Sequence, residues 1–233
     1  IKYVTTRNTN EVKAAKKVCS KDTFSYKELG AAVKATGDDQ LYRLYLEYLP
    51  LSFSRRHGDP SRPWNKFSIN RRDSLGNPIL NYEGNWRDIF QNWEALAMSY
   101  PSYTTGMISK FVNATSCDGF NPYRITRSGL DWEVPEPENP WSNIGYWNDH
   151  QIIYLSKLLE LQNQLDPEAL NSLLNKPLFT TANIPYHIKS YADIEKNPRS
   201  TIAFNYDLND KIEADQKKYG TDAKLMGKNG NPY

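Results

Sequence analysis

Apolar residues recur every three or four positions along much of this chain, a period that is typical of amphipathic α-helices. Pro101 should end one such helix, and a second is expected from about Tyr103 to Val112. The first of these two lies in residues 85–100, with apolar positions at Trp86, Ile89, Phe90, Trp93, Leu96, Ala97 and Tyr100. An earlier helix is predicted up to Pro50, with apolar positions at Leu41, Leu44, Tyr45, Tyr48 and Leu49.

Capping residues and helix breakers mark where other helices begin and end. Ser25 and Glu28 have the spacing of a capping box, and Gly37 favours an end to that helix. A long helix is expected from near Tyr146, and Asp166 should cap the short helix PEALNSLL that follows it. A charged helix, DLNDKIEADQKKYG, is predicted near the end of the sequence. One face of a first helix is expected to hold Val12, Ala15, Lys16 and Cys19.

Two long segments between these helices show no amphipathic period. They are residues 51–84 and 113–145, and both are rich in aromatic residues, which favours ordered, functional loops. Strand-like alternation is short and scarce, with TIAFNY the best example. We therefore expect an all-α fold with long ordered loops. Residues 1–184 should form its main body, and residues 185–233 a Pro-containing connector and a charged C-terminal helix.

The composition excludes several classes of protein. The 233 residues carry 29 Lys and Arg against 27 Asp and Glu, and this formal charge of +2 gives no bulk basic surface for nucleic acid. No apolar run approaches the roughly 18–20 residues that span a bilayer. Cys19 and Cys117 are too few for a disulfide framework or a CxxC metal site. We expect a cytoplasmic protein that binds neither nucleic acid nor membrane and uses no metal or cofactor.

Two loop-to-helix junctions carry the residues with the most chemistry. One is NYEGNWRD at residues 81–88, and the other is NIGYWNDH at residues 143–150. Each places Gly, aromatic residues, Asn and an acid in the first turn of an apolar helix. The helix dipole would hold Asp88 and Asp149 ionised there. Capping alone explains a single Asp, but it does not require the surrounding Trp and Tyr.

Aromatic rings beside carboxylates are suited to sugars. The C–H face of a pyranose stacks on Trp or Tyr, and its hydroxyls bond to Asn, Asp and Arg. Glycosidic cleavage also needs an acid that protonates the leaving oxygen and a second group on the opposite side. All six Trp lie between Trp64 and Trp147, and the densest pairing of acid and indole is DWE at residues 131–133. The candidate acids are Asp88, Glu94, Asp131, Glu133, Glu136 and Asp149.

Several charged residues keep two interpretations. Glu136 and Glu138 fit a solvated acidic loop better than a site. A run of basic residues could grip an anion such as phosphate, or it could be solvated or ion-paired at the surface. That run is Arg55, Arg56 and His57. His187 precedes a polar connector and belongs to no recognisable constellation.

Three segments within roughly residues 41–161 resemble a known family. They are NYEGNWRDIFQNWEALAMSYP, FVNATSCDGFNPYRITRSGLDWE and NPWSNIGYWNDHQIIYLSKLLE. They resemble large bacterial proteins described as cellobiose-phosphorylase-like and, more distantly, (α/α)6 glycosidases of the glycogen-debranching type. Those enzymes share an aromatic–Arg–Asp helix start, a D-G-x-x-P loop and a helix with Asp near Trp. The matching residues here are 86–88, 118–122 and 147–149.

The resemblance implies an (α/α) toroid whose inner helices present loops around a sugar-binding pocket. A complete toroid is longer than this chain, which would supply about half of the ring as part of a larger polypeptide. The function implied is a glycoside hydrolase or phosphorylase acting on glucan-like oligosaccharides.

Inversion is the expected mechanism, with Glu133 as general acid and Asp88 as the next catalytic candidate. Substrate contacts are expected from Trp86, Arg87, Asp131, Trp132, Trp141, Trp147, Asp149 and His150. In a phosphorylase, inorganic phosphate would bind Arg55, Arg56 and His57. Two alternatives stay open. One is a non-catalytic sugar-binding or scaffold segment, and the other is an all-helical interaction module whose Trp side chains form the core.

Overall fold

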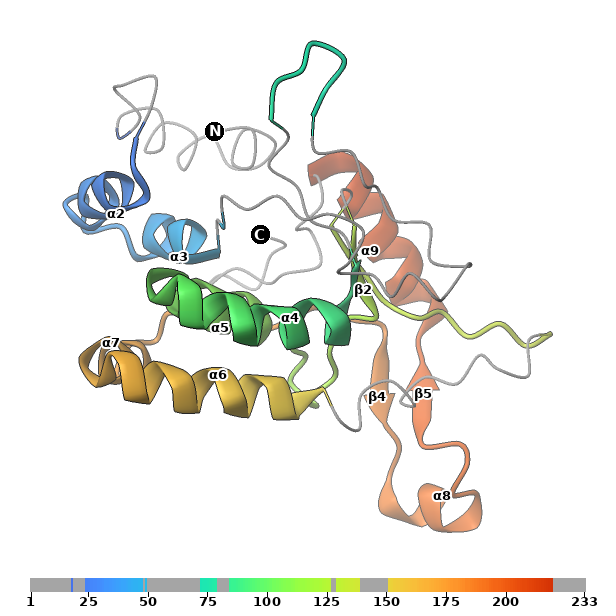
Figure 1. Cartoon of the computed structure of the whole chain (residues 1–233). Coiled ribbons are helices and arrows are strands. Elements are labelled where there is room, and N and C mark those ends of the chain that lie inside the picture. Colours follow the sequence, from blue (N-terminus) through green and yellow to red (C-terminus); the bar gives the residue numbers. More distant parts are fainter. Residues whose placement is uncertain are drawn as a thin grey trace.

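The computed structural model is broadly helical and has two small β-sheets among the described residues (Figure 1). The residues that the structure describes are Val18, 24–47, Leu49, 72–78, 84–126, 129–138 and 151–219. The helices are α2 (Tyr26–Lys34), α3 (Asp39–Glu47), α4 (Trp86–Ser99), α5 (Thr104–Asn113), α6 (Ile152–Leu165), α7 (Pro167–Leu174), α8 (Tyr191–Lys196) and α9 (Tyr206–Tyr219), with a 3₁₀ helix η2 (Pro101–Tyr103) between α4 and α5. The strands are β1 (Gly84–Asn85), β2 (Arg124–Thr126), β3 (Gly129–Asp131), β4 (Tyr186–Ile188) and β5 (Ile202–Phe204).

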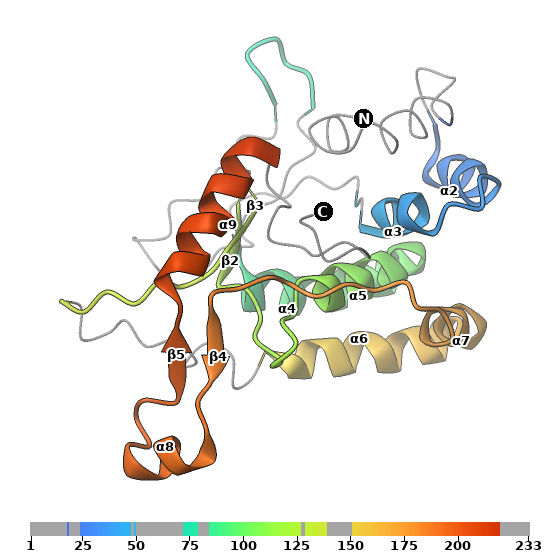
Figure 2. The same cartoon turned by 180° about the vertical axis from the view of Figure 1, so that it is seen from behind.

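Helix α5 is central to the packing of the helices. It packs against α3 and α6, and α4 packs on α6 beside it (Figure 2). The apolar stripe of α4 faces inward as predicted, because Trp86, Ile89, Phe90 and Trp93 have no exposed surface. Phe90 makes edge-to-face contacts with Trp93 and with Phe111 of α5, each with ring centroids 4.9 Å apart. Burying a side chain such as Phe90 is worth about 1.5–3 kcal/mol, so this stripe is a main source of stability.

The predicted boundaries of α2 are confirmed. The backbone N–H of Ser25 donates to the Glu28 carboxylate at 2.8 Å, and the backbone N–H of Glu28 donates to Ser25 Oγ at 3.2 Å. These are the two bonds of a capping box. After α2, Gly37 adopts a φ of 66°, a left-handed conformation that favours glycine and turns the chain toward α3.

Other predicted boundaries also agree with the structure. Helix α4 ends before Pro101, and the Asp166 carboxylate accepts a hydrogen bond of 2.9 Å from the backbone N–H of Ala169 at the start of α7. The charged helix near the end of the sequence is α9. The expected helix start near Tyr146 and the first helix, apart from Val18, lie outside the described residues. None of the described helices combines the length and the apolar composition that a membrane span requires.

The prediction that residues 113–145 lack regular structure is wrong in part. Strands β2 and β3 pair there as an antiparallel hairpin, and β1 adds to β2 in the order β1-β2-β3. Strands of two or three residues are too short for an alternating pattern, so the sequence alone did not reveal them. Strand β5 confirms the strand expected in TIAFNY, and its antiparallel partner is β4.

A charged network lies inside the core between α3 and α5. Arg43 and Glu47, one turn apart on α3, form an ion pair whose side chains are 1% and 2% exposed. The side chain of Asn113 donates a hydrogen bond of 2.6 Å to Glu47 Oε1, and its Oδ1 accepts one of 2.8 Å from the backbone N–H of Thr180. This buried network, Arg43, Glu47 and Asn113, therefore connects α3, α5 and the segment after α7.

Helices α3 and α5 approach each other closely at Gly106. A Cβ atom at this position would lie 2.5 Å from the backbone oxygen of Leu46 and 2.8 Å from the side chain of Leu49. The first of these neighbours is backbone and cannot move aside easily. The absence of a side chain at Gly106 therefore permits the contact that closes the buried network.

Candidate functional site

The β1-β2-β3 sheet brings two distant parts of the sequence together. Asn85 pairs with Arg124, and Arg124 pairs with Asp131 on the next strand. The backbone N–H of Trp86 donates to the carbonyl of Tyr123 at 3.0 Å, so the start of α4 is joined directly to this sheet. We call the polar residues at this place the polar edge, and they are Asn85, Arg87, Asp88, Arg124, Asp131 and Glu133.

Asp88 lies in the first turn of α4, as the sequence predicted. Its carboxylate accepts a hydrogen bond of 3.3 Å from the side chain of Asn85 and lies 3.8 Å from Arg87 Nε. The Asp88 side chain is 14% exposed and that of Arg87 is 34% exposed. A carboxylate at this position is favoured by the partial positive charge of the helix N-terminus. Asp88 is thus held in place while part of its surface faces solvent.

Arg124 and Asp131 form a cross-strand ion pair. Arg124 Nε lies 2.7 Å from Asp131 Oδ2, and the two side chains are 43% and 30% exposed. The distance is that of a charge-assisted hydrogen bond, and the exposure leaves both groups accessible to a ligand. The neighbouring residues Ile125 and Leu130 are buried, so the sheet has one apolar face toward the core.

Trp132 and Glu133 follow β3 and border the aromatic part of the core. The Trp132 ring, which is partly buried, contacts Tyr186 edge-to-face with centroids 5.9 Å apart. Its indole N–H is buried and has no hydrogen-bond acceptor among the described residues. Burial raises the pKa of the Tyr186 phenol, and the negative charge of Glu133 raises it further. The charge of Glu133 thus acts on the Tyr186 phenol, which belongs to the buried core.

Trp86 is not available as a stacking surface, which corrects the expectation from the sequence. Its side chain is 0% exposed and packs against Phe90 and Phe111, so no face of the indole can meet a sugar. Trp86 belongs to the apolar stripe of α4 as well as to the junction. Because that stripe packs into the core, it determines where the Trp86 side chain lies. Of the predicted platforms, Trp132 is the one with partial exposure among the described residues.

The other acidic candidates that the structure describes lie at the surface, and several further candidates lie outside the described residues. Glu94 forms an exposed ion pair of 3.0 Å with Lys157 on α6, which accounts for it as a surface residue. Glu136 and Glu138 are exposed, in agreement with a solvated loop. The remaining candidates lie outside the described residues, and they are Arg55, Arg56, His57, Trp141, Trp147, Asp149 and His150.

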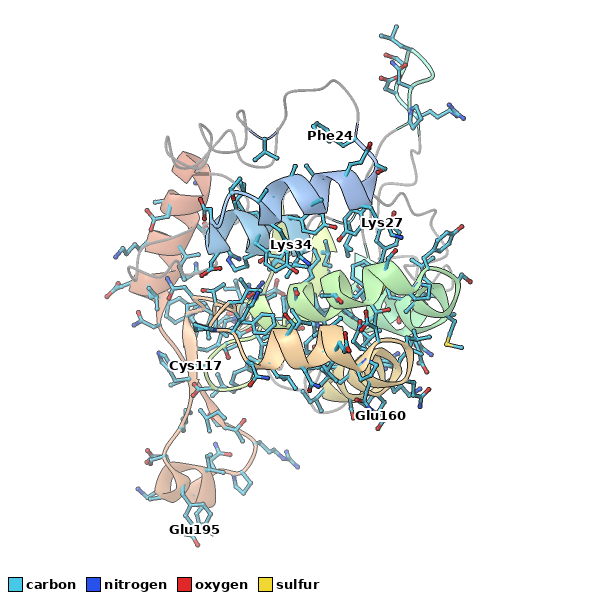
Figure 3. The ribbon with its side chains drawn as sticks, turned by 90° about the vertical axis from the view of Figure 1, so that its left-hand side faces the viewer. Phe24, Lys27, Lys34, Cys117, Glu160 and Glu195 are labelled. Atoms are coloured by element: carbon cyan, nitrogen blue, oxygen red, sulfur yellow. The ribbon has the colours of Figure 1, made fainter. Side chains whose placement is uncertain are left out.

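The D-G-x-x-P loop forms a tight turn beside β4. Gly119 has a φ of 86°, and the Ser116 hydroxyl accepts a hydrogen bond of 2.9 Å from the backbone N–H of Phe120. Cys117 is an exposed free thiol on this turn (Figure 3). The carboxylate of Asp118 lies 3.5 Å from His187 Nδ1 on β4. His187 therefore has a partner that the sequence did not reveal.

The structure also contains a pocket that no motif recognised in the sequence indicated. It lies at the start of α9, and its lining residues are His187, Ala203, Phe204, Asn205, Tyr206 and Asp207. The signal was present in FNYD at residues 204–207, which places aromatic rings, Asn and an acid at a helix start as the other two junctions do. Its position after a Pro-containing connector concealed that similarity.

The side chains of the polar edge offer acid–base and hydrogen-bonding chemistry.

The chain matches none of the models of known protein families, and no curated protein is similar enough to be a match. Among the described residues, no three His, Cys, Asp or Glu side chains are grouped as a metal site would require. What remains is a set of carboxylates, guanidinium groups and a partly exposed indole around one small sheet. Its function rests on the chemistry of those groups.

Proposed function

We propose that this chain is the carbohydrate-contacting segment of a glycoside hydrolase or phosphorylase. The observation that carries the proposal is the pairing of β1, β2 and β3, which brings Asp88 at the start of α4 to the same sheet as Asp131. Carboxylates, Arg87 and Arg124 can bond to sugar hydroxyls, and Trp132 offers an indole beside them. The resemblance of the sequence to (α/α)6 glycosidases favours the same function and implies that the helices belong to a larger toroid.

The proposed chemistry is inversion at the anomeric carbon. Glu133, whose charge acts on the buried Tyr186 phenol, donates its proton to the glycosidic oxygen as the bond from that oxygen to the anomeric carbon breaks. Asp88 is the candidate base, which takes a proton from the water that attacks the opposite face. In a phosphorylase, inorganic phosphate attacks in place of that water and no base is needed. The products are then a sugar phosphate and a shortened oligosaccharide.

A product screen tests this proposal. The chain is incubated with a panel of gluco-oligosaccharides, with and without inorganic phosphate, and the larger polypeptide implied by the resemblance is tested in parallel. Sugar phosphate formed only with phosphate identifies a phosphorylase, and reducing sugar formed in both conditions identifies a hydrolase. We expect Glu133→Gln to lower turnover about 10²–10⁴-fold, because general-acid catalysis contributes that much. A fully active Glu133→Gln variant would contradict the assignment of the acid.

Glu94→Gln is the matched control for that variant. Glu94 is also a half-exposed carboxylate, but it pairs with Lys157 on the outside of α4 and α6. The control should keep its turnover, and both variants should keep their unfolding midpoints because surface substitutions usually change stability by less than about 0.5 kcal/mol. Equal losses in both variants would point to a general effect on the fold.

A non-catalytic sugar-binding segment is the second candidate. The observation that favours it is the engagement of two of the carboxylates, since Asp131 is paired with Arg124 and Asp88 is bonded to Asn85. Such pairs can orient sugar hydroxyls without transferring a proton. In that case oligosaccharides bind and are not turned over, and Glu133→Gln leaves the affinity unchanged.

A further inference from the structure

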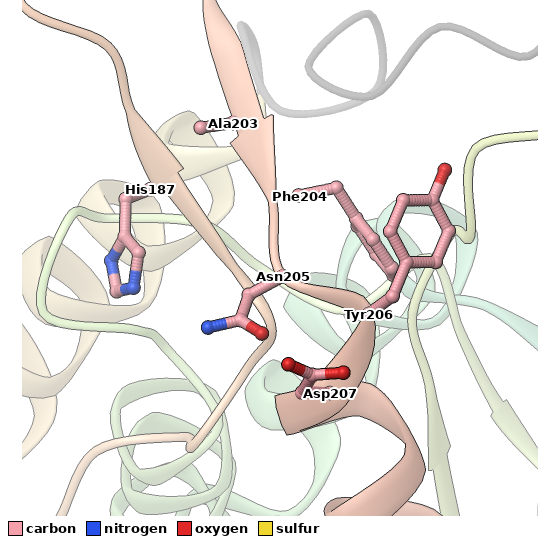
Figure 4. Close-up of a pocket in the computed structure, with 6 residues that line it drawn as sticks. All are labelled: His187, Ala203, Phe204, Asn205, Tyr206 and Asp207. Atoms are coloured by element: carbon pink, nitrogen blue, oxygen red, sulfur yellow. The ribbon is translucent and has the colours of Figure 1, made fainter.

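An open pocket of about 480 Å³ lies between the β4–β5 hairpin and the start of α9 (Figure 4). Its volume is within the range of about 300–1,000 Å³ that is typical of small-molecule sites. Residues of both strands and of the first turn of α9 line it, so three elements fix its shape. The polar edge contributes no residue to it.

An aromatic wall forms one side of this pocket. Tyr206, the first residue of α9, is 55% exposed, and its ring contacts Phe204 edge-to-face with centroids 4.8 Å apart. Phe204 in turn contacts the buried Tyr186 at 6.0 Å. Figure 4 shows the Tyr206 ring in front of Phe204. The ring is thus supported from the core while more than half of the residue stays accessible.

Polar side chains form the other side. Asn205 Oδ1 accepts a hydrogen bond of 3.0 Å from the backbone N–H of Leu208, which orients the amide so that its Nδ2 points toward His187 (Figure 4). His187 Nδ1 lies 3.5 Å from the Asp118 carboxylate. Asp207 adds two carboxylate oxygens as acceptors. Donors and acceptors therefore face the same space as the aromatic ring.

We propose that this pocket binds a sugar ring as a distal subsite, with the C–H face of the sugar on Tyr206 and its hydroxyls bonded to Asn205 and Asp207. A hydroxyl donates and accepts at once, which fits a mixed lining of amide, imidazole and carboxylate. A cation would also favour Tyr206 and Asp207. However, the N-terminus of α9 places partial positive charge beside the pocket and disfavours a cationic ligand.

The distal subsite rests on the proposed function and extends it. Trp132, which follows Asp131 of the polar edge, is linked to Tyr206 through three ring contacts of 5.9, 6.0 and 4.8 Å, by way of Tyr186 and Phe204. The Trp132 and Tyr206 rings are therefore separated by no more than the sum of these three centroid distances. A short oligosaccharide can span that separation. One oligosaccharide could therefore contact both places, with its reacting bond at the polar edge.

The test is an NMR titration of the isotope-labelled chain with maltotetraose, with cellotetraose and, as a cation probe, with choline. We expect one of the sugars to shift the backbone amide resonances of residues 187 and 203–207. Tyr206→Ala should weaken this binding about tenfold, the factor that corresponds to about 1.4 kcal/mol. Asp207→Asn, which keeps the shape of the side chain, should weaken it severalfold. The matched control is Tyr191→Ala, because Tyr191 is likewise an exposed first residue of a helix, on α8.

The outcomes separate this inference from the function on which it rests. Sugar-dependent shifts at residues 203–207 that Tyr206→Ala weakens and Tyr191→Ala does not would support the distal subsite. Shifts confined to residues 84–88 and 124–133 would overturn the distal subsite and leave the proposed function in place. Shifts with choline and none with either sugar would overturn the sugar assignment. No shifts at all with the sugars would count against both proposals.

Discussion

Two groups of charged side chains in this chain have the same chemistry and differ in burial. In the buried network the Arg43 and Glu47 side chains are 1% and 2% exposed. At the polar edge the Arg124 and Asp131 side chains form a similar guanidinium–carboxylate pair with 43% and 30% exposure. An Asn accompanies each group, Asn113 in the first and Asn85 in the second.

This difference in burial has consequences for stability and for access to solvent. A buried ion pair is tolerated only when its partners satisfy each other, and removing one of them leaves the other desolvated. An exposed pair is screened by water and contributes little to stability. The exposed pair at the polar edge therefore contributes little to the stability of the fold. Its groups can exchange their water for a polar ligand, whereas those of the buried network cannot.

Removing the Glu47 carboxylate should have the largest effect on stability. Glu47→Ala takes the ion pair from Arg43 and the 2.6 Å hydrogen bond from Asn113 inside the core. We expect the free energy of unfolding to fall by about 3–5 kcal/mol, the usual result of breaking a buried pair. Urea unfolding followed by circular dichroism measures it.

Glu94→Ala is the control for this experiment. Glu94 is also on a helix and pairs with a basic residue, Lys157, but the Lys157 and Glu94 side chains are 44% and 38% exposed. Its loss should cost about 0–1 kcal/mol. If Glu47→Ala were no more destabilising than Glu94→Ala, burial would not be what distinguishes the two groups.

The helices could be predicted from the sequence because their signals are local. The stripe of α4, the capping box of Ser25 and Glu28, and the cap at Asp166 each depend on residues within one or two turns. The buried network could not be predicted, because Glu47 and Asn113 lie on different helices and meet only when α3 packs on α5 at Gly106. Helical periodicity predicts which face of a helix is apolar. It does not predict which polar residue becomes buried when two helices pack together.

The sequence predicted the residues of the candidate site but not that they lie together. The junction at Asp88 and the segment with Trp132 and Glu133 were identified from acids beside aromatic residues. Their meeting at one sheet depends on strands of two or three residues, which leave no periodic pattern. Trp86 shows a different limit of the sequence. It belongs both to the apolar stripe of α4 and to the polar junction, and the junction predicted a sugar contact. In the structure Trp86 is buried in the core.

Alkaline pH should destabilise the fold through the buried phenol of Tyr186. Burial and the charge of Glu133 raise the pKa of Tyr186 above its ordinary value of 10.0. Above pH 10 the unfolded chain therefore loses this proton before the folded chain does. The contribution of Tyr186 is fully present below that pH and declines as the pH rises, by about 1.4 kcal/mol per pH unit. Urea unfolding at a series of pH values should show a shallower alkaline decline in Tyr186→Phe.

Glu133→Gln tests whether this carboxylate contributes to the raised pKa of the Tyr186 phenol. Removing the negative charge should bring the pKa of Tyr186 back toward 10.0 while burial keeps it raised. An NMR titration of the tyrosine rings measures the change. An unchanged Tyr186 titration would mean that the charge of Glu133 does not act on this phenol, and its assignment as general acid would lose its environment.

The smallest expected effect is the coupling between Arg124 and Asp131. A double-mutant cycle with Arg124→Gln, Asp131→Asn and the combined variant isolates the energy of this pair from the other effects of each substitution. We expect about 0.2–1 kcal/mol, decreasing at high salt, because both side chains are exposed at their 2.7 Å contact. The same variants should weaken oligosaccharide binding more than they weaken the fold. A coupling of several kcal/mol that salt does not change would place this pair with the buried network, and the polar edge would then be a structural feature of the sheet.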